Sequence, residues 1–305
     1  MTLYSSVDDM IGETPLLELR HMGYPDGVRV FAKLESANPA GSVKDRVGRY
    51  MIRDAEEKGL LKKGSTIVEA TAGNTGIGIA LAALNKGYRI IFAVPTKFSE
   101  EKQKIMKALG AEIVNTPKEK GMLGAIEEAE RIRASIPGAI ELKQFENESN
   151  PLCHYETTGP EIYRDLNGRV DYAVMGAGSG GTFSGIVGYL KSRNPDVKGV
   201  LADPEGSIIG GGEKAEYQIE GIGNDFIAKT MDTSLIDIVY KVKDEEAFEM
   251  CRRLALNEGI LAGQSSGAAL VAVEKLARDV GKGNIVTVLP DRGDRYLSKG
   301  LFDKP

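Results

Sequence analysis

Three segments of this chain combine glycines and small hydroxyl residues at points where a strand pattern gives way to a helix pattern. They are residues 36–46 (SANPAGSVKDR), 69–78 (EATAGNTGIG) and 176–182 (GAGSGGT). Free backbone N–H groups at the start of a helix can hold a carboxylate or a phosphate. The second and third segments therefore predict anion binding, although a glycine-rich turn can also serve backbone conformation alone.

Lys44 is the residue of the first segment that could act as an amine nucleophile. It follows a turn through Asn38, Pro39 and Gly41 and lies at the start of a predicted helix. The helix dipole disfavours an ammonium group at this end, which favours the neutral amine that covalent catalysis by lysine requires. From this segment alone, a solvated surface lysine is the alternative.

The segment 176–182 also matches the looser pattern GxGxxG at Gly176, Gly178 and Gly181. In dinucleotide-binding folds an acidic residue about 20 residues further on binds the ribose, and Asp203 stands at roughly that distance. The lysine pattern of the P-loop is absent. A nicotinamide dinucleotide and the phosphate of another cofactor both remain open for this loop.

Strand and helix patterns alternate around these loops along the chain. Apolar, β-branched runs predict strands at residues 28–34, 66–69, 89–94, 112–115, 172–175, 199–202, 237–242 and 285–289. Helices are predicted at residues 45–58, 76–84, 99–109, 122–135, 183–191, 244–257 and 267–279, with Ser99 as an N-cap. This alternation indicates mostly parallel sheets covered by helices, in two α/β lobes. The polar segment 147–151 (NESNP) predicts a boundary.

The composition excludes several classes of protein. Of 305 residues, 42% are hydrophobic and 27% charged, and the net charge of -5 argues against a nucleic-acid partner. Cys153 and Cys251 are far apart and predict reduced, buried thiols, while two histidines, His21 and His154, exclude a His-rich metal site. We expect no metal and no membrane partner, and a soluble, cytoplasmic protein, because no signal peptide or long apolar stretch is present.

Taken together, the segments resemble the fold-type II pyridoxal phosphate (PLP) enzymes of the cysteine synthase and cystathionine β-synthase family. The resemblance rests on ten ordered motifs at residues 11–19, 32–46, 69–82, 107–114, 150–162, 176–186, 203–208, 220–227, 259–270 and 289–302. It implies a two-lobed fold like that of the tryptophan synthase β subunit. Residues 35–147 would form a smaller, mobile domain with the substrate carboxylate loop, and residues 1–34 plus 148–305 a larger domain with a phosphate cup. It also implies a homodimer.

The resemblance implies roles for single residues. Lys44 would bind PLP as a Schiff base and serve as acid and base at the substrate Cα. Asn74 would hydrogen-bond the cofactor's 3′ oxygen, and Ser265 would face its pyridine nitrogen. The phosphate cup would be Gly178, Ser179, Gly180, Gly181 and Thr182. The substrate would be bound by Thr71, Ala72, Gly73, Thr75, Gln144 and Gly221. The family usually has serine where this chain has Ala72, so one hydroxyl contact is missing.

The motifs NPLCHYETT, DPEGSI and EGIGNDF look closer to haem-free bacterial cystathionine β-synthases than to cysteine synthases. They imply β-replacement on serine, O-acetylserine or cysteine, with homocysteine as the thiol and cystathionine as the product. The alternatives are cysteine synthesis from O-acetylserine and sulfide, and a cysteine-consuming lyase that releases hydrogen sulfide or forms lanthionine. Residues 220–225 are our hypothesis for thiol selection. A nicotinamide dehydrogenase and an inactive binding module are the rivals from other classes.

Overall fold

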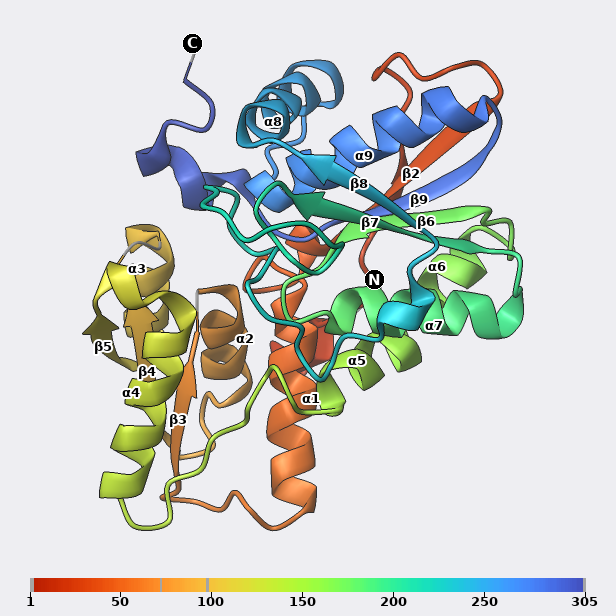
Figure 1. Ribbon diagram of the computed structural model, residues 1–305. Helices are drawn as coiled ribbons and strands as arrows, with labels where there is room; N and C mark the ends of the chain where they lie inside the picture. Colours follow the sequence, from red (N-terminus) through yellow and green to blue (C-terminus); the bar gives the residue numbers. More distant parts are fainter. Residues whose placement is uncertain (1–2, 72, 97–98, 304–305) are drawn as a thin grey trace. The chain divides into compact units, whose positions relative to one another are not determined.

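The computed structural model describes residues 3–71, 73–96 and 99–303, and the chain divides into two compact α/β units (Figure 1). The smaller unit comprises Met1–Ile11 and Asn38–Ser149, and the larger unit comprises Gly12–Ala37 and Asn150–Pro305. The third and last crossing between the units, from Ser149 to Asn150, thus falls within the polar segment 147–151.

The N-terminal residues pack with the smaller unit, whereas the sequence analysis placed them in the larger domain. Arg49 accounts for this difference, because its guanidinium donates to the backbone carbonyls of Asp8 and Ile11, both at 3.4 Å. The same guanidinium also lies 3.4 Å from the Asp8 carboxylate.

The smaller unit is built on a parallel sheet in the order β3-β4-β5. Its strands are β3 (Thr66–Ala70), β4 (Arg89–Pro95) and β5 (Glu112–Thr116), and its helices are α1 (Lys44–Glu57), α2 (Asn74–Ala82), α3 (Glu100–Ala108) and α4 (Gly121–Ser135). The backbone around Ile140 extends the sheet beside β3 through a parallel bridge to Ile67. Apolar residues of α4 cover one face of β3 and β4, and this contact forms one apolar core of the unit.

The larger unit is built on a six-stranded sheet in the order β1-β2-β9-β6-β7-β8. Its strands are β1 (Leu16–Glu18), β2 (Val28–Leu34), β6 (Tyr172–Gly176), β7 (Lys198–Pro204), β8 (Ile238–Val242) and β9 (Gly283–Leu289). Only the pairing of β1 with β2 is antiparallel among these strands. The mostly parallel sheets and flanking helices confirm the predicted fold class.

Helices cover both faces of the six-stranded sheet, as parallel sheets require. They are α5 (Ser149–Cys153), α6 (Gly159–Asp165), α7 (Gly181–Arg193), α8 (Asp244–Glu258) and α9 (Gln264–Val280). One apolar core lies between the sheet and α8 and α9, and a second lies on the opposite face against α6 and α7 (Figure 1). A π-helix, His154–Thr158, connects α5 to α6.

Short 3-10 helices complete the described elements. They span Asp8–Met10, Glu35–Ala37, Lys118–Lys120, Thr233–Leu235 and Gly293–Lys299. Within the described residues, no helix combines the length and apolar character needed to cross a bilayer. Over the same part of the chain, no three His, Cys, Asp or Glu side chains cluster so that they could hold a metal ion. Both cysteines are buried free thiols.

Candidate active site

The loop between β6 and α7 has the form of an anion receptor. Gly180 is the N-cap of α7 in a left-handed conformation, with φ of 83°, so the first N–H groups of the helix face the loop without helical partners. The carbonyl of Gly178 accepts from Asn224 Nδ2 at 2.9 Å, and the carbonyl of Ser179 accepts from Thr230 Oγ1 at 2.5 Å. These two side chains occupy carbonyl oxygens that would otherwise repel an anion.

The glycines of this loop are required by close packing. A Cβ on Gly178 would lie 2.6 Å from the Gly221 carbonyl oxygen, and one on Gly181 would lie 2.1 Å from Asn150 Oδ1. Both distances are too short for real atoms, so larger residues would displace the loop. The packing also brings two predicted site residues, Gly178 and Gly221, into direct contact.

Side chains behind the loop orient its two hydroxyl groups. Asn150 Nδ2 donates to Ser179 Oγ at 2.9 Å, and His154 Nε2 lies 3.2 Å from Thr182 Oγ1. Both supporting residues are fully buried. Asn150 was not predicted to belong to the site, and His154 was predicted to have no chemical role. Both lie in the motif at residues 150–162, which was the only signal for them in the sequence.

Ser265 lies in the first turn of α9 and is buried. A Cβ on Gly221 would lie 3.9 Å from Ser265 Oγ, so Gly221 is a neighbour of this hydroxyl. The preceding backbone is fixed, because Glu220 N donates to Gln264 Oε1 at 2.9 Å. The larger unit therefore brings the predicted phosphate cup, Gly221 and Ser265 together.

Asp203, the residue that supported the hypothesis of a nicotinamide dinucleotide, is bound to groups of the protein itself. It is fully buried at the end of β7, and its Oδ2 lies 2.6 Å from Lys241 Nζ and accepts from Gly210 N at 2.9 Å. Lys241 Nζ also donates to the Ser207 carbonyl. A buried carboxylate paired in this way holds the loop after β7 and is not displayed to a ribose.

In the smaller unit, Lys44 and Asn74 each begin a helix, as residues of α1 and α2. The two helices cross closely, because a Cβ on Gly78 would lie 2.2 Å from the Lys44 carbonyl oxygen. The turn before Lys44 is held by Asp45, whose Oδ2 accepts from Ala40 N at 2.6 Å. The structure therefore places a lysine and an amide side chain at adjacent helix N-termini.

The predicted substrate loop lies between β3 and α2. Thr71 Oγ1 accepts from the backbone N–H groups of Gly73 and Gly76, at 3.1 and 3.0 Å. Thr75 Oγ1 donates to Gln144 Oε1 at 2.7 Å. Four of the predicted residues thus share one hydrogen-bonded loop, while Ala72 lies outside the described residues.

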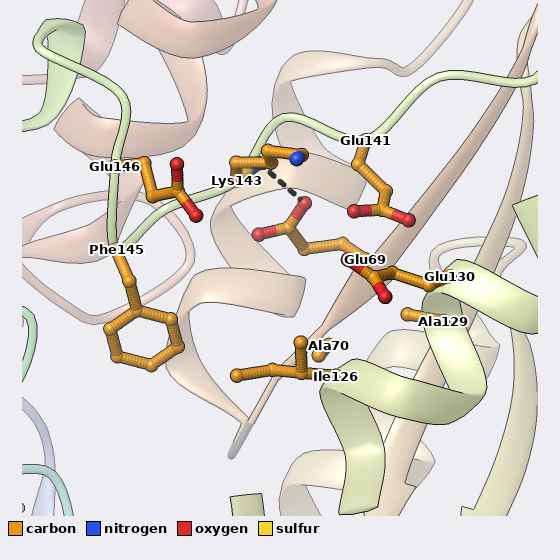
Figure 2. Close-up of a pocket in the computed structure, with 9 residues that line it drawn as sticks. All are labelled: Glu69, Ala70, Ile126, Ala129, Glu130, Glu141, Lys143, Phe145 and Glu146. Carbon is orange, nitrogen blue, oxygen red and sulfur yellow. Dashed lines mark hydrogen bonds between the residues drawn. The ribbon is translucent and has the colours of Figure 1, made fainter. Parts of the chain in front are cut away.

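Two further buried residues near this loop were not singled out from the sequence. The stem of buried Lys102 lies across Gly73, where an added Cβ would be 2.5 Å from Lys102 Cδ. Glu69 lies at the end of β3 beside a pocket lined by Glu69, Ala70, Ile126, Ala129, Glu130, Glu141, Lys143, Phe145 and Glu146 (Figure 2). Burial raises the pKa of the Glu69 carboxyl to about 7, against three backbone hydrogen bonds that lower it.

Comparison with known proteins gives the family. A family model described as pyridoxal-phosphate dependent enzyme matches residues 7–291. An O-acetylserine dependent cystathionine β-synthase of Bacillus subtilis is 49% identical over 304 residues, which are 99% of each chain. A cysteine synthase of Helicobacter pylori is 45% identical over 305 residues, or 99% of this chain and 100% of the relative.

A solved structure agrees with the sequence relatives. The crystal structure of an O-acetylserine dependent cystathionine β-synthase from Helicobacter pylori has a TM-score of 0.95 and is 44% identical, covering 99% of this chain and 100% of its own. The predicted resemblance is therefore confirmed at the level of fold and cofactor class. The chain belongs to the family of pyridoxal-phosphate dependent enzymes, among the fold-type II members that include cysteine synthases and cystathionine β-synthases.

Proposed function

We propose that this enzyme replaces the β-substituent of O-acetylserine or serine with the thiol of homocysteine, which forms cystathionine. The observation that carries the proposal is the full-length similarity, in sequence and in structure, to O-acetylserine dependent cystathionine β-synthases. A cysteine synthase of nearly equal identity supports sulfide as the alternative nucleophile. The relatives agree on β-replacement and differ in the thiol.

The described residues of the larger unit fit the phosphate group of PLP. The cup of residues 178–182 offers N–H donors at the start of α7, and the Gly178 and Ser179 carbonyls are engaged by Asn224 and Thr230. Ser179 and Thr182 add hydroxyl groups that Asn150 and His154 hold in place. This set of donors suits a phosphate dianion.

Ser265 and Asn74 would contact the ring of the cofactor. A buried neutral hydroxyl at Ser265 would leave the pyridine nitrogen unprotonated, and Asn74 would hydrogen-bond the 3′ oxygen. When bound, PLP supplies an electron sink for the negative charge that develops at the substrate Cα. A neutral partner on the ring nitrogen weakens that sink, which favours elimination at Cβ.

Lys44 would hold the cofactor covalently and then move the proton. Its Nζ would be the base that takes the proton from the substrate Cα. It would return that proton to Cα after the β-substituent has left and the thiol has bonded to Cβ. The start of α1 favours the neutral amine for this work, because the helix dipole opposes an ammonium group there.

The smaller unit would bind the carboxylate of the amino acid. Thr71, Gly73, Thr75 and Gln144 already share a hydrogen-bonded loop that could close on it, and Ala72 adds no side-chain hydroxyl. As a mobile domain, this unit would order the loop around the bound substrate and exclude water from its reactive carbon. The family resemblance also supports a homodimer as the working assembly.

A crossed product assay tests the proposal. Serine, O-acetylserine and cysteine are each combined with homocysteine or sulfide, and mass spectrometry identifies the product. We expect O-acetylserine with homocysteine to give cystathionine with the highest kcat/KM. Faster formation of cysteine from sulfide would favour the cysteine synthase alternative, and hydrogen sulfide released with lanthionine from cysteine alone would favour the lyase.

The loop 220–225 remains our proposal for thiol selection. Its two ends are held by ion pairs, since the Glu220 carboxylate contacts Lys299 Nζ and Asp225 lies 2.5 Å from Lys214 Nζ. Exchange of this loop for that of a cysteine synthase should shift the preference from homocysteine toward sulfide. An unchanged ratio of the two kcat/KM values would reject the role of the loop.

A further inference from the structure

The end of β3 carries a buried carboxylate that binds three successive backbone N–H groups. Glu69 is 3% exposed, and its Oε2 accepts from the N–H groups of Leu142 and Lys143, while its Oε1 accepts from Gln144 N. All three distances are 2.9 Å. Figure 2 shows the Glu69 side chain directed toward the backbone of Lys143.

The backbone of residues 142–144 has the geometry of an anion receptor. The chain pairs with β3 up to Ile140, since Val68 N donates to the Ile140 carbonyl at 2.8 Å. It then turns at Lys143, which has a left-handed conformation with φ of 55°. Such a turn makes successive N–H groups converge on one point. A lysine disfavours this conformation, so the Glu69 carboxylate stabilises a turn that the sequence by itself opposes.

The same turn fixes the side chain of Gln144. Its Nε2 donates to the Ala70 carbonyl at 3.0 Å, and its Oε1 accepts from Thr75 Oγ1 at 2.7 Å. Consecutive residues of β3, Glu69 and Ala70, therefore bind the backbone and the side chain of Gln144.

We propose that Glu69 is a positioning residue, whose carboxylate closes the turn at residues 142–144 and thereby orients Gln144 toward the carboxylate of the amino-acid substrate. The proposal rests on the substrate-binding role proposed for Gln144 and Thr75. Glu69 would act through Gln144 and would not touch the reacting atoms.

The charge state of Glu69 should control the turn. An ionised carboxylate can accept hydrogen bonds from all three N–H groups. A protonated carboxyl group carries a hydrogen of its own, which faces these N–H donors and weakens the hydrogen bonds. Burial raises its pKa to about 7, so both forms are accessible near neutral pH. The register partner of Glu69 on β4 is the uncharged Phe92. The charged residues that line the same pocket are Glu130, Glu141, Lys143 and Glu146 (Figure 2).

Glu69→Gln tests the proposal with little change in size. Its amide group must face at least one of the three N–H donors, so the turn loses a hydrogen bond. We expect the KM for the amino-acid substrate to rise about tenfold, with kcat changed less than about twofold. Amide hydrogen exchange of the holoenzyme should become faster at residues 142–144.

Glu141→Gln is the matched control. Glu141 lines the same pocket, but its carboxylate lies 3.2 Å from Arg133. Loss of the Glu141 charge favours the ionised form of Glu69, so this variant should raise neither the KM nor the exchange at residues 142–144. An equal rise of KM in both variants would indicate a general effect of pocket charge and would overturn the positioning role.

Amide exchange at residues 142–144 and the KM for the amino-acid substrate test the role of Glu69 separately from the proposed function. Unchanged exchange at residues 142–144 in Glu69→Gln would overturn the closure of the turn, and faster exchange with an unchanged KM would overturn its link to the substrate. If Glu69→Gln does not fold, amide exchange at residues 142–144 of the wild type is measured against pH and corrected for its intrinsic pH dependence. The corrected rate should then change with a midpoint near pH 7. A rate that does not change with pH would overturn the inference. A wild-type enzyme without β-replacement activity rejects the proposed function, while the exchange comparison, which needs no turnover, still decides the role of Glu69.

Discussion

His154 Nε2 lies 3.2 Å from Thr182 Oγ1, and His154 Nδ1 lies 2.9 Å from Thr158 Oγ1. The buried imidazole therefore joins a hydroxyl of the phosphate cup to one of its own π-helix, His154–Thr158. π-helical turns are rare and often mark functional sites. Here the turn presents a histidine to the first turn of α7.

Removal of this imidazole should weaken cofactor binding. His154→Leu leaves the Thr182 hydroxyl without the group that orients it, and we expect the Kd for PLP to rise about tenfold in a fluorescence titration of the apoenzyme. His21→Leu replaces the other histidine, which is exposed, and should bind PLP as the wild type does. Thr182→Val should add little to His154→Leu, and full additivity of the two changes would contradict the coupling.

The shape of the phosphate cup should depend on Gly180. Its φ is 83°, and an added Cβ would lie 2.4 Å from Met231 Cβ. Gly180→Ala should lower the free energy of unfolding by about 3 kcal/mol, from backbone strain and overpacking. Gly211→Ala has a similar φ of 82° and open space, so it should cost only about 1 kcal/mol. Equal urea midpoints for both variants would show that the contact with Met231 has no effect.

Stability should depend on pH through Glu69. Its folded-state pKa of about 7 exceeds the ordinary value of 4.5, so the folded protein binds this proton more tightly than the unfolded chain. The resulting stabilisation is fully present below pH 4.5 and is lost as the pH rises through 7, by about 3 kcal/mol. Urea unfolding measures this loss. Between pH 5 and about pH 8, the free energy of unfolding of the wild type should fall by most of this amount relative to that of Glu69→Gln. Parallel pH profiles for the two proteins would contradict it.

The ion pair of Asp203 and Lys241 should support the loop after β7. Lys241→Met leaves a fully buried carboxylate without its cation, which should cost about 3 kcal/mol in chemical unfolding. Lys214→Met removes an exposed partner of Asp225 and should cost less than about 1 kcal/mol. A small effect of Lys241→Met would leave Asp203 available for another role.

The sequence was most informative about strands and least informative about where helices begin. The predicted strand at residues 28–34 matches β2, and Ser99 caps α3 by accepting from Lys102 N as expected. Three helices were predicted to begin at residues 76, 183 and 267, but they begin at Asn74, Gly181 and Gln264. Glycine and small polar residues have low helix propensity, so their first turns looked like loops. Tertiary contacts make them helical and place Asn74, Thr182 and Ser265 in first turns.

Long-range partners could not be read from the sequence. Glu69 binds Leu142, Lys143 and Gln144, which follow it in the chain by 73 to 75 positions. No local sequence pattern predicts such a contact. The short strand β1 and the run of α5, π-helix and α6 were also missed, since each is too short to show a clear periodicity. The turns from β3 to α2 and from β6 to α7 were predictable, because clustered glycines between a strand pattern and a helix pattern indicate a tight turn. That these turns bind anions stays a prediction.

The most direct test of the central claim is peptide mapping after borohydride reduction, which fixes PLP to the amine that carries it. We predict that the label lies on Lys44 and that Lys44→Ala loses both the label and the yellow colour. Lys58→Ala, at the other end of α1, should keep both. A label on another lysine, or a Lys44→Ala protein that still takes the label, would contradict the assignment of Lys44.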